Sequence, residues 1–168
     1  MIQIRDAHID DLPRTLTIYN QSVVKSTATF DLEEKTLEER QEWFSYHGGA
    51  HPLIVAELDG EVVGYSCLSR FRDKPAYAKT VESSVYIDER HTGKGIGKLL
   101  MKEILKRAVE LGHHVVIAGI TAGNDASIQL HLNLGFEPVG VFKEVGYKFG
   151  AWQDVHFYQL MLPASDKA

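Results

Sequence analysis

Cysteine and long hydrophobic runs are nearly missing from this sequence, and both absences restrict what the protein can be. Cys67 is the single cysteine among 168 residues, which excludes an intrachain disulfide and suits a reducing compartment. No apolar run approaches the roughly 20 residues that cross a bilayer. The first dozen residues carry acids and lack the apolar core of a signal peptide. We therefore expect a cytoplasmic protein with no membrane partner.

Positive charge is also scarce. The chain has 18 Lys and Arg against 23 Asp and Glu, which gives a net charge of −5 at pH 7. Without a basic excess to displace phosphate counterions, nucleic acid is not expected as a partner. His47 and His51 stand four apart, but the two glycines between them break any helix, so no metal site is expected. The length fits a single domain, which we place at residues 1–162, with a short tail at 163–168.

Hydrophobic periodicity predicts an α/β fold in which strands and helices alternate as β-α-α-β-β-β-α-β-α-β-β. Asp59-Gly60 is a strong two-residue hairpin signal, and Thr36 with Glu39 has the spacing of a helix capping box. A strand–helix–strand unit in the second half predicts a parallel pair within a mixed sheet. The predicted strands span residues 2–5, 52–58, 61–71, 80–88, 115–120, 138–148 and 155–162.

The glycine-rich turn at residues 90–97 is the most informative segment. It follows a predicted strand and opens a predicted helix that Gly112 ends. The first turn of a helix presents unpaired backbone N–H groups and a positive dipole end, and glycines let an anion approach them closely. Arg90, Lys94 and Lys98 add positive charge to the turn. The segment therefore predicts a cradle for a phosphate-bearing ligand.

Two common phosphate motifs fit this turn poorly. A nucleotide P-loop needs a glycine five places before Gly93 and a Ser or Thr where Gly95 stands. A dinucleotide fingerprint needs a third glycine where Lys98 stands, and an acid that Ile120-Thr121 does not provide. A plain flexible turn before a helix remains the simplest alternative, although three alternate glycines with three cations exceed what a turn needs.

The turn does match Q/R-x-x-G-x-G/A, the pyrophosphate motif of the GNAT acetyltransferase superfamily. Further stretches resemble its phosphinothricin and methionine sulfoximine acetyltransferase group, at residues 29–31, 77–86, 124–127, 130–136 and 146–155. The resemblance implies a GNAT fold, a mixed and mostly antiparallel sheet of about six to seven strands with about four helices and a central parallel pair. It also implies acetyl-CoA as cofactor, direct acetyl transfer to the α-amine of a small amino-acid-like substrate, and a homodimer.

Glu82 is the candidate general base. Strand alternation places it with Ser84 and Tyr86, opposite the apolar Val81 and Val85, where partial burial would raise its pKa toward a useful value. An exposed strand glutamate is the alternative, and the resemblance favours the catalytic role. His131 is the second candidate, because it stands where many GNAT enzymes carry a proton-donating tyrosine. With an ordinary pKa near 6.5 it can act as acid or base, or simply pack beside the cofactor.

The resemblance also implies the cofactor contacts. Backbone groups of β-strand residues 85 and 87 would meet the acetyl carbonyl and pantetheine arm, and the glycine-rich turn would hold the pyrophosphate. Asn124 would meet the pantetheine amides, or serve as a helix N-cap, and the two roles are compatible. The expected cofactor-binding residues are Val85, Tyr86, Ile87, Arg90, Thr92, Gly93, Lys94, Gly95, Ile96, Gly97, Lys98, Asn124 and Ser127.

The acceptor pocket is expected to include Phe30, the loop at residues 72–77 and residues near Trp152. A free amino acid needs a cation for its carboxylate, and Arg72 and Lys74 are the candidates, although some relatives have arginine at the place of Lys74, and lysine lacks the bidentate fork. The expected substrate-binding residues are Phe30, Arg72, Lys74, Pro75, Ala76, Tyr77, Glu82 and Ser84.

Two other functions remain open from the sequence. A GNAT enzyme can acetylate a peptide or protein N-terminus, which requires an open groove. A non-catalytic acetyl-CoA sensor is the other possibility, against which the presence of both Glu82 and His131 argues. The aromatic C-terminal strands are interpreted as core, substrate wall and dimer contact, and Cys67 as structural.

Overall fold

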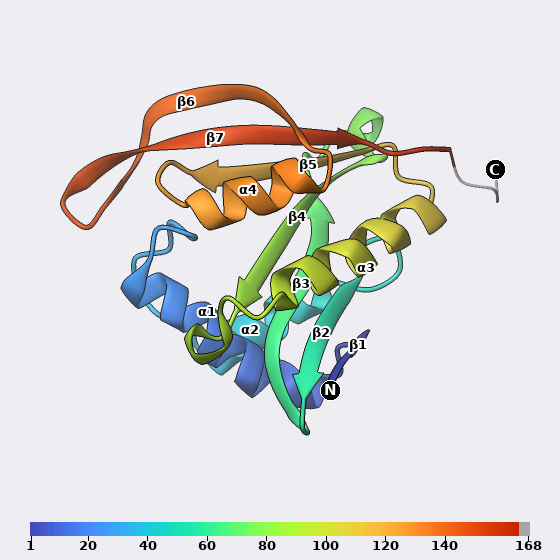
Figure 1. The fold of residues 1–168 in the computed structure, drawn as a ribbon, viewed down its shortest axis with the longest axis vertical. Helices are drawn as coiled ribbons and strands as arrows, with labels where there is room; N and C mark the ends of the chain where they lie inside the picture. The colour runs from blue at the N-terminus through green and yellow to red at the C-terminus, as the bar shows by residue number, and fades with distance from the viewer. Residues whose placement is uncertain (165–168) are drawn as a thin grey trace.

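The computed structural model describes residues 1–164. In it, four α-helices pack on a single seven-stranded sheet (Figure 1). The sheet order is β1-β2-β3-β4-β5-β7-β6. Only the β4–β5 pair is parallel in this part of the chain. The expected GNAT-like mixed sheet is therefore confirmed. The elements are β1 Ile2–Asp6, α1 Leu12–Lys25, α2 Leu37–Ser45, β2 Leu53–Leu58, β3 Glu61–Arg70, β4 Thr80–Ile87, α3 Ile96–Glu110, β5 Val115–Thr121, α4 Asp125–Asn133, β6 Glu137–Lys148 and β7 Ala151–Met161.

The parallel pair separates soon after it forms. β4 and β5 pair at three positions only, from Thr80 opposite Val115 to Glu82 opposite Ile117. Beyond Glu82 the two strands run apart, and Figure 1 shows the opening between them. The edge of β4 that faces β5 therefore has backbone groups without a strand partner, at the place where the resemblance puts the acyl donor.

Helices cover both faces of the sheet and enclose two hydrophobic clusters. α3 and α4 pack on one face, against a cluster that includes Val81 and Leu100. α1 and α2 pack on the other face, against a cluster that includes Ile18 and Tyr65. β4 divides its side chains between them as expected from its alternation, since Val85 packs on the first cluster and Tyr86 on the second. This division puts Glu82 on the face of α1 and α2.

Short-range signals in the sequence were reliable guides to turns and caps. Asp59 and Gly60 both have positive φ, 51° and 85°, as a tight hairpin of this type requires. The capping box at α2 is complete, because Glu39 N donates to Thr36 Oγ1 at 3.2 Å and Thr36 N donates to Glu39 Oε1 at 3.1 Å. Both predictions are confirmed.

The last hairpin differs from the prediction. β7 begins at Ala151, four residues before the expected start, because Phe149 and Gly150 form a tight turn with φ of 54° and 71°. Trp152 and Gln153 then pair with β6, although they lack the alternation typical of a strand. The loop expected at residues 72–78 contains a 3-10 turn over Pro75–Tyr77.

Two further expectations concern the ends and the membrane. The expected tail starts at Pro163, and its last four residues lie outside the described part of the chain. None of the helices within residues 1–164 has the length and apolar character that crossing a bilayer requires.

Candidate active site

The glycine-rich turn has the geometry of an anion cradle. Gly93 and Gly95 adopt φ of 74° and 79°, and a Cβ atom at either position would meet nothing within 4 Å. The first helical hydrogen bond of α3 joins Leu99 N to Gly95 O at 3.2 Å, so the N–H groups of the three preceding residues have no partner within the helix. Gly95 supplies no side-chain cap. The turn therefore fits a phosphate group, which would accept from these N–H groups.

Arg90, which is expected to help hold the pyrophosphate, is paired with two carboxylates. Its guanidinium does not extend alone into the turn, because Nη2 lies 2.9 Å from Asp88 Oδ2 and 3.1 Å from Glu61 Oε1. Asp88 is fully buried, and its Oδ2 also accepts from Arg14 Nη2 at 2.6 Å. Hydrogen bonds from the Arg90 guanidinium, from the Arg90 backbone N–H and from Arg14 hold the pKa of Asp88 well below its usual range, although burial of the carboxylate acts to raise it. Arg90 thus braces the turn. The exposed Lys94 and Lys98 have no ion pair within residues 1–164, and Lys94 Nζ lies 3.2 Å from His91 Nδ1.

A narrow slot opens between the separated strands β4 and β5. Its volume is about 70 Å³, and Asn124, Ser127 and His131 close it from α4. Asn124 Oδ1 accepts from Ser127 N at 3.3 Å, so the N-cap role anticipated for Asn124 is present. The lining residues are Ala28, Ser84, Val85, Tyr86, Ala118, Gly119, Ile120, Thr121, Asn124, Ser127 and His131. The structure thus brings four of the expected cofactor-binding residues, Val85, Tyr86, Asn124 and Ser127, together in one slot.

His131 is buried in this slot with one ring nitrogen already engaged. Its Nδ1 lies 2.7 Å from the carbonyl oxygen of Ser127. A carbonyl only accepts, so Nδ1 carries the proton and Nε2 keeps its lone pair when the ring is neutral. Burial lowers the pKa of His131, and the bond to Ser127 opposes this only in part. The neutral ring is therefore the favoured form at pH 7.

Glu82 lies where the two strands part, half-buried and without a polar partner. The carboxylate has no hydrogen bond or ion pair within residues 1–164, and burial raises its pKa above the usual range. Its cross-strand neighbour on β3 is Ser69. A carboxylate that is partly desolvated and unpaired is suited to accept a proton.

A second cavity, of about 430 Å³, lies on the Glu82 face of the sheet, and we call it the aromatic cavity. Ser84 and Tyr86 line both this cavity and the slot, so the two spaces adjoin across β4. Ser69, the neighbour of Glu82, also lines it. The residues around it are Tyr19, Asp31, Lys35, Glu39, Arg40, Glu42, Trp43, Tyr46, Tyr65, Cys67, Ser69, Ser84 and Tyr86.

Most residues expected around the acceptor lie outside the aromatic cavity. Phe30 is 36% exposed and covers Gly146 of β6. Arg72 lies on the surface, stacked over Tyr77 at 5.5 Å, with Nη1 3.4 Å from the Tyr77 hydroxyl. Lys74, Pro75 and Ala76 are exposed beside it. Of the expected acceptor set only Ser84 lines this cavity, and the role of the 72–77 loop stays a prediction.

Arg40 is a buried cation lining the aromatic cavity that the sequence analysis did not single out. It stands three positions before Trp43, on the inner side of α2, and is 4% exposed. An arginine in phase with the apolar side of a short helix was the available signal. Its guanidinium contacts the rings of Tyr19 and Tyr65, which the fold brings to it from α1 and β3.

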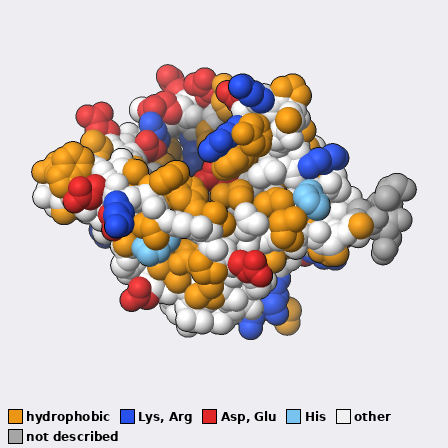
Figure 2. Space-filling view, turned by 90° about the horizontal axis from the view of Figure 1, so that it is seen from above, with side chains coloured by type: hydrophobic (Ala, Val, Ile, Leu, Met, Phe, Trp, Pro, Cys, Tyr) orange, Lys and Arg blue, Asp and Glu red, His pale blue; other side chains and the backbone are white. Residues whose placement is uncertain are grey.

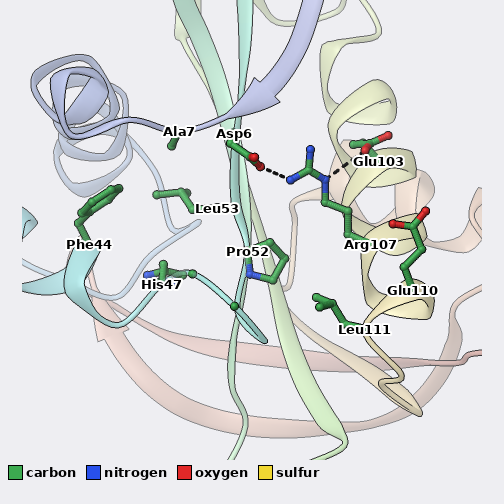
Figure 3. Close-up of a pocket in the computed structure, with 12 residues that line it drawn as sticks. Asp6, Ala7, Phe44, His47, Pro52, Leu53, Glu103, Arg107, Glu110 and Leu111 are labelled. Atoms are coloured by element: carbon green, nitrogen blue, oxygen red, sulfur yellow. Dashed lines mark hydrogen bonds and ion pairs between the residues drawn. The ribbon is translucent and has the colours of Figure 1, made fainter. Parts of the chain in front are cut away.

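A larger cavity, about 610 Å³, lies away from these residues (Figure 3). Figure 3 shows Arg107 of α3 paired with Asp6 and Glu103, with Phe44 and His47 on the other side. Its basic group is therefore already neutralised, and no expected site residue lines it. A larger volume therefore does not mark this cavity as the active site.

Comparisons with known proteins agree with this geometry. Residues 14–136 match the acetyltransferase (GNAT) family. A Pseudomonas aeruginosa protein named L-methionine sulfoximine/L-methionine sulfone acetyltransferase is 42% identical over 98% of this chain and 97% of its own length. A phosphinothricin acetyltransferase from Sinorhizobium meliloti, solved in complex with AcCoA, is 37% identical with a TM-score of 0.94, covering 99% of this chain and 91% of that one. A structure named ribosomal-protein-alanine N-acetyltransferase, from Brucella melitensis, is 42% identical with a TM-score of 0.93, covering 95% and 99%.

Proposed function

This chain belongs to the acetyltransferase (GNAT) family, and we propose that it acetylates the α-amine of a small amino acid of the methionine sulfoximine, methionine sulfone or phosphinothricin type. Acetyl-CoA is the acetyl donor. One observation carries the proposal: an unpaired, half-buried Glu82 lies on β4 next to Ser84, which lines both the narrow slot between β4 and β5 and the separate aromatic cavity. The names of the relatives supply the substrate class.

Two features of the chain suit two parts of acetyl-CoA, the pyrophosphate and the pantetheine arm. The N-terminus of α3, with two left-handed glycines and no side-chain cap, suits the pyrophosphate. The slot between β4 and β5 suits the pantetheine arm, and Asn124 and Ser127 border it. When bound, this donor supplies an activated thioester carbonyl. Unpaired backbone N–H groups on the open edge of β4 stabilise the negative charge that builds on the carbonyl oxygen.

Glu82 prepares the acceptor for direct transfer. An α-amine has a pKa of roughly 8 and is mostly protonated at neutral pH, so it must lose a proton before it can attack. Glu82 takes that proton, directly or through a water molecule, while acceptor and donor are bound together. A C–N bond forms and the C–S bond breaks. The attacking nitrogen gives up its second proton, directly or through water, to the departing thiolate, and Glu82 releases the first proton to solvent.

His131 is proposed to act in its neutral form. The bond from Nδ1 to Ser127 holds the ring with the Nε2 lone pair available to accept a hydrogen bond from a group in the slot. Protonation of the thiolate by His131 would require an imidazolium that its lowered pKa disfavours. We therefore propose that His131 orients the bound donor and does not protonate the thiolate.

Thiol release from acetyl-CoA with a panel of acceptors tests the function. Methionine sulfoximine, methionine sulfone and phosphinothricin should be acetylated much faster than polyamines or short peptides. Glu82→Gln should keep acetyl-CoA affinity and lose on the order of 100- to 10,000-fold in kcat. Glu110→Gln, an exposed glutamate at the end of α3, is the matched control and should retain full activity. Full activity of Glu82→Gln would refute the general-base role.

Protein or peptide N-terminal acetylation is the second candidate, and the name of the Brucella structure favours it. The same panel separates the two, because faster acetylation of alanine-terminated peptides than of free amino acids would favour the peptide function. Binding of acetyl-CoA without turnover of any acceptor would instead support a sensor.

We also propose that the protein is a homodimer, through the β6–β7 hairpin. Large apolar side chains project into solvent along it, including Val141, Phe142, Tyr147 and Trp152. Figure 2 looks down on this side of the molecule and shows apolar side chains gathered across it. An exposed apolar surface of this kind typically marks a contact between proteins. Sedimentation analysis should find twice the monomer mass, and Phe142→Lys should reduce it to that of the monomer.

A further inference from the structure

Lys148 is a buried cation at the end of β6. The residue is 3% exposed, and its ammonium group has no ion pair within residues 1–164. Two backbone carbonyls accept from Nζ instead, that of Thr29 at 2.8 Å and that of Ser22 at 3.4 Å. Burial lowers the pKa of Lys148. Burying a charge costs free energy that an apolar side chain would avoid, so the ammonium group calls for a reason in the structure around it.

The segment between α1 and α2 at residues 26–31, which we call the strap, is held by side chains from three strands. Besides the bond from the lysine on β6, Thr121 Oγ1 of β5 donates to Thr27 O at 2.7 Å. The Tyr86 hydroxyl of β4 lies 3.5 Å from Ala28 O, as a long hydrogen bond. Three consecutive carbonyls of the strap therefore face donors from three different strands. Each donor satisfies a carbonyl that has no partner in a helix or strand, and together they fix the backbone of the strap.

The strap lies at the opening between β4 and β5. Ala28 lines the slot between these strands, together with Asn124 and Ser127 of α4. Asp31, at the other end of the strap, lines the aromatic cavity. Figure 1 shows the strap beside α4 and close to the tip of the β6–β7 hairpin. One short segment thus borders both the slot proposed for the acetyl donor and the cavity on the side of the base.

The end of β6 is shaped around the strap. Gly146 and Lys148 are the two buried residues of this strand, and the other ten are exposed. The ring of Phe30, in the strap, lies so close to Gly146 that a Cβ atom there would come within 2.5 Å of it. Residues two apart on a strand point to the same face, so the ring and the ammonium contact lie side by side. β6 therefore meets the strap with a flat glycine for the ring and a cation for the backbone.

We propose that Lys148 is a positioning residue for acetyl transfer, which holds the strap through the Thr29 carbonyl as a fixed wall between the slot and the acceptor. This inference deepens the proposed function and rests on it. Without the ammonium group, the strap occupies its place for only a fraction of the time, and the apparent affinity for the acceptor falls by that fraction. An acceptor that has bound still finds the strap in place, so kcat is little affected.

Two measurements on Lys148→Met, whose side chain is of similar length but has no N–H donor, test this role. Hydrogen exchange followed by mass spectrometry should show the amides of residues 26–31 exchanging about tenfold faster, the order of effect expected for one lost bond to a charged group, with α3 unchanged. With acetyl-CoA saturating, KM for methionine sulfone should rise about tenfold, while kcat stays within about twofold. Lys148→Arg supplies the charge and donors again and should restore most of both quantities. Lys102→Met, an exposed cation of α3, should behave as wild type.

Each result decides the proposal. Circular dichroism establishes that the variants are folded, and Lys148→Gln, which keeps an N–H donor without the charge, carries the test with the same expected changes if Lys148→Met does not fold. Unchanged exchange in the strap, or a lower kcat at unchanged KM, would overturn the positioning role. Faster exchange in α3 as well would also overturn it, because it would show a general loosening of the fold. If wild type acetylates no acceptor of the panel, the proposed function fails, and exchange in the strap still decides whether Lys148 holds it.

Discussion

Replacing Asp88 with asparagine tests how the fold supports the glycine-rich turn. The carboxylate accepts four hydrogen bonds: from Arg90 N at 3.0 Å and Arg90 Nε at 3.3 Å on Oδ1, and from Arg14 Nη2 at 2.6 Å and Arg90 Nη2 at 2.9 Å on Oδ2. Asparagine has the same shape, but one of its two acceptor positions becomes an NH₂ group facing donors. The substitution therefore removes the charge and at least two bonds together.

The size of the effect follows from the exposure of the partners. Hydrogen bonds to a charged group contribute about 1.5–3 kcal/mol each, and breaking a fully buried ion pair costs about 3–5 kcal/mol. Asp88 is fully buried, but the Arg14 and Arg90 side chains are 30% and 59% exposed and can be solvated by water. We therefore expect a loss near the lower end, about 3 kcal/mol. For a chain of this size the melting temperature should fall by about 6–12 °C.

The loss should also reach the cofactor. Asp88 caps the turn that leads into the phosphate cradle, so acetyl-CoA should bind about tenfold more weakly to Asp88→Asn, or ~1.4 kcal/mol. Thermal or urea unfolding and titration calorimetry measure the two effects. Asp73→Asn is the control, because Asp73 is 97% exposed and 3.7 Å from Arg70, and it should change neither quantity.

The pH dependence gives an independent check on the same carboxylate. The pKa of Asp88 is lowered in the folded state, chiefly by Arg90, so its stabilisation is present above the unfolded carboxyl pKa of about 3.9 and is lost as the pH falls below it. The stability difference between wild type and Asp88→Asn should accordingly be large at pH 7 and shrink in acid. Tighter acetyl-CoA binding by the variant would refute the reasoning, because it would mean that Arg90, once released, is itself the phosphate ligand.

Three further predictions concern the base, the cradle and the acceptor wall. Because burial raises the pKa of Glu82, the acid limb of the kcat/KM profile should lie above the pH range of an ordinary carboxyl group, and it should vanish in Glu82→Gln. The raised pKa also means that ionising Glu82 destabilises the folded protein as the pH rises through that pKa. Glu82→Gln should therefore have a higher melting temperature than wild type at pH 8 and not at pH 4. Gly95→Ala forces an alanine to φ near 79° in open space, and it should cost about 1–2 kcal/mol in unfolding free energy while weakening acetyl-CoA binding, as calorimetry can measure. Gly146→Ala would place a Cβ 2.5 Å from Phe30 Cε2 and displace that ring, so steady-state kinetics should show a raised KM for the acceptor with acetyl-CoA affinity unchanged.

Much of the fold was predictable because its signals are local. The capping box at Thr36, the hairpin at Asp59-Gly60 and the alternation of β4 each involve residues within a few positions of one another, and all three are confirmed. The parallel β4–β5 pair also followed from the order of elements, because a strand, a crossing helix and a second strand return in the same direction. The start of β7 was wrong because Trp152 and Gln153 become strand through pairing with β6, and their own sequence has no strand pattern.

The sequence by itself determined the order of the elements, the glycine-rich turn before α3 and the face of β4 that carries Glu82. These depend on backbone propensity and on the period of two or 3.6 residues, which act over a few positions. Only the tertiary structure decided that Arg90 braces Asp88, that Arg14 reaches Asp88 across 74 positions, and that Arg40 lies buried among three aromatic rings without a counterion. Each of these depends on which distant side chains the packed sheet and helices bring within a few ångströms, and on how much water they exclude.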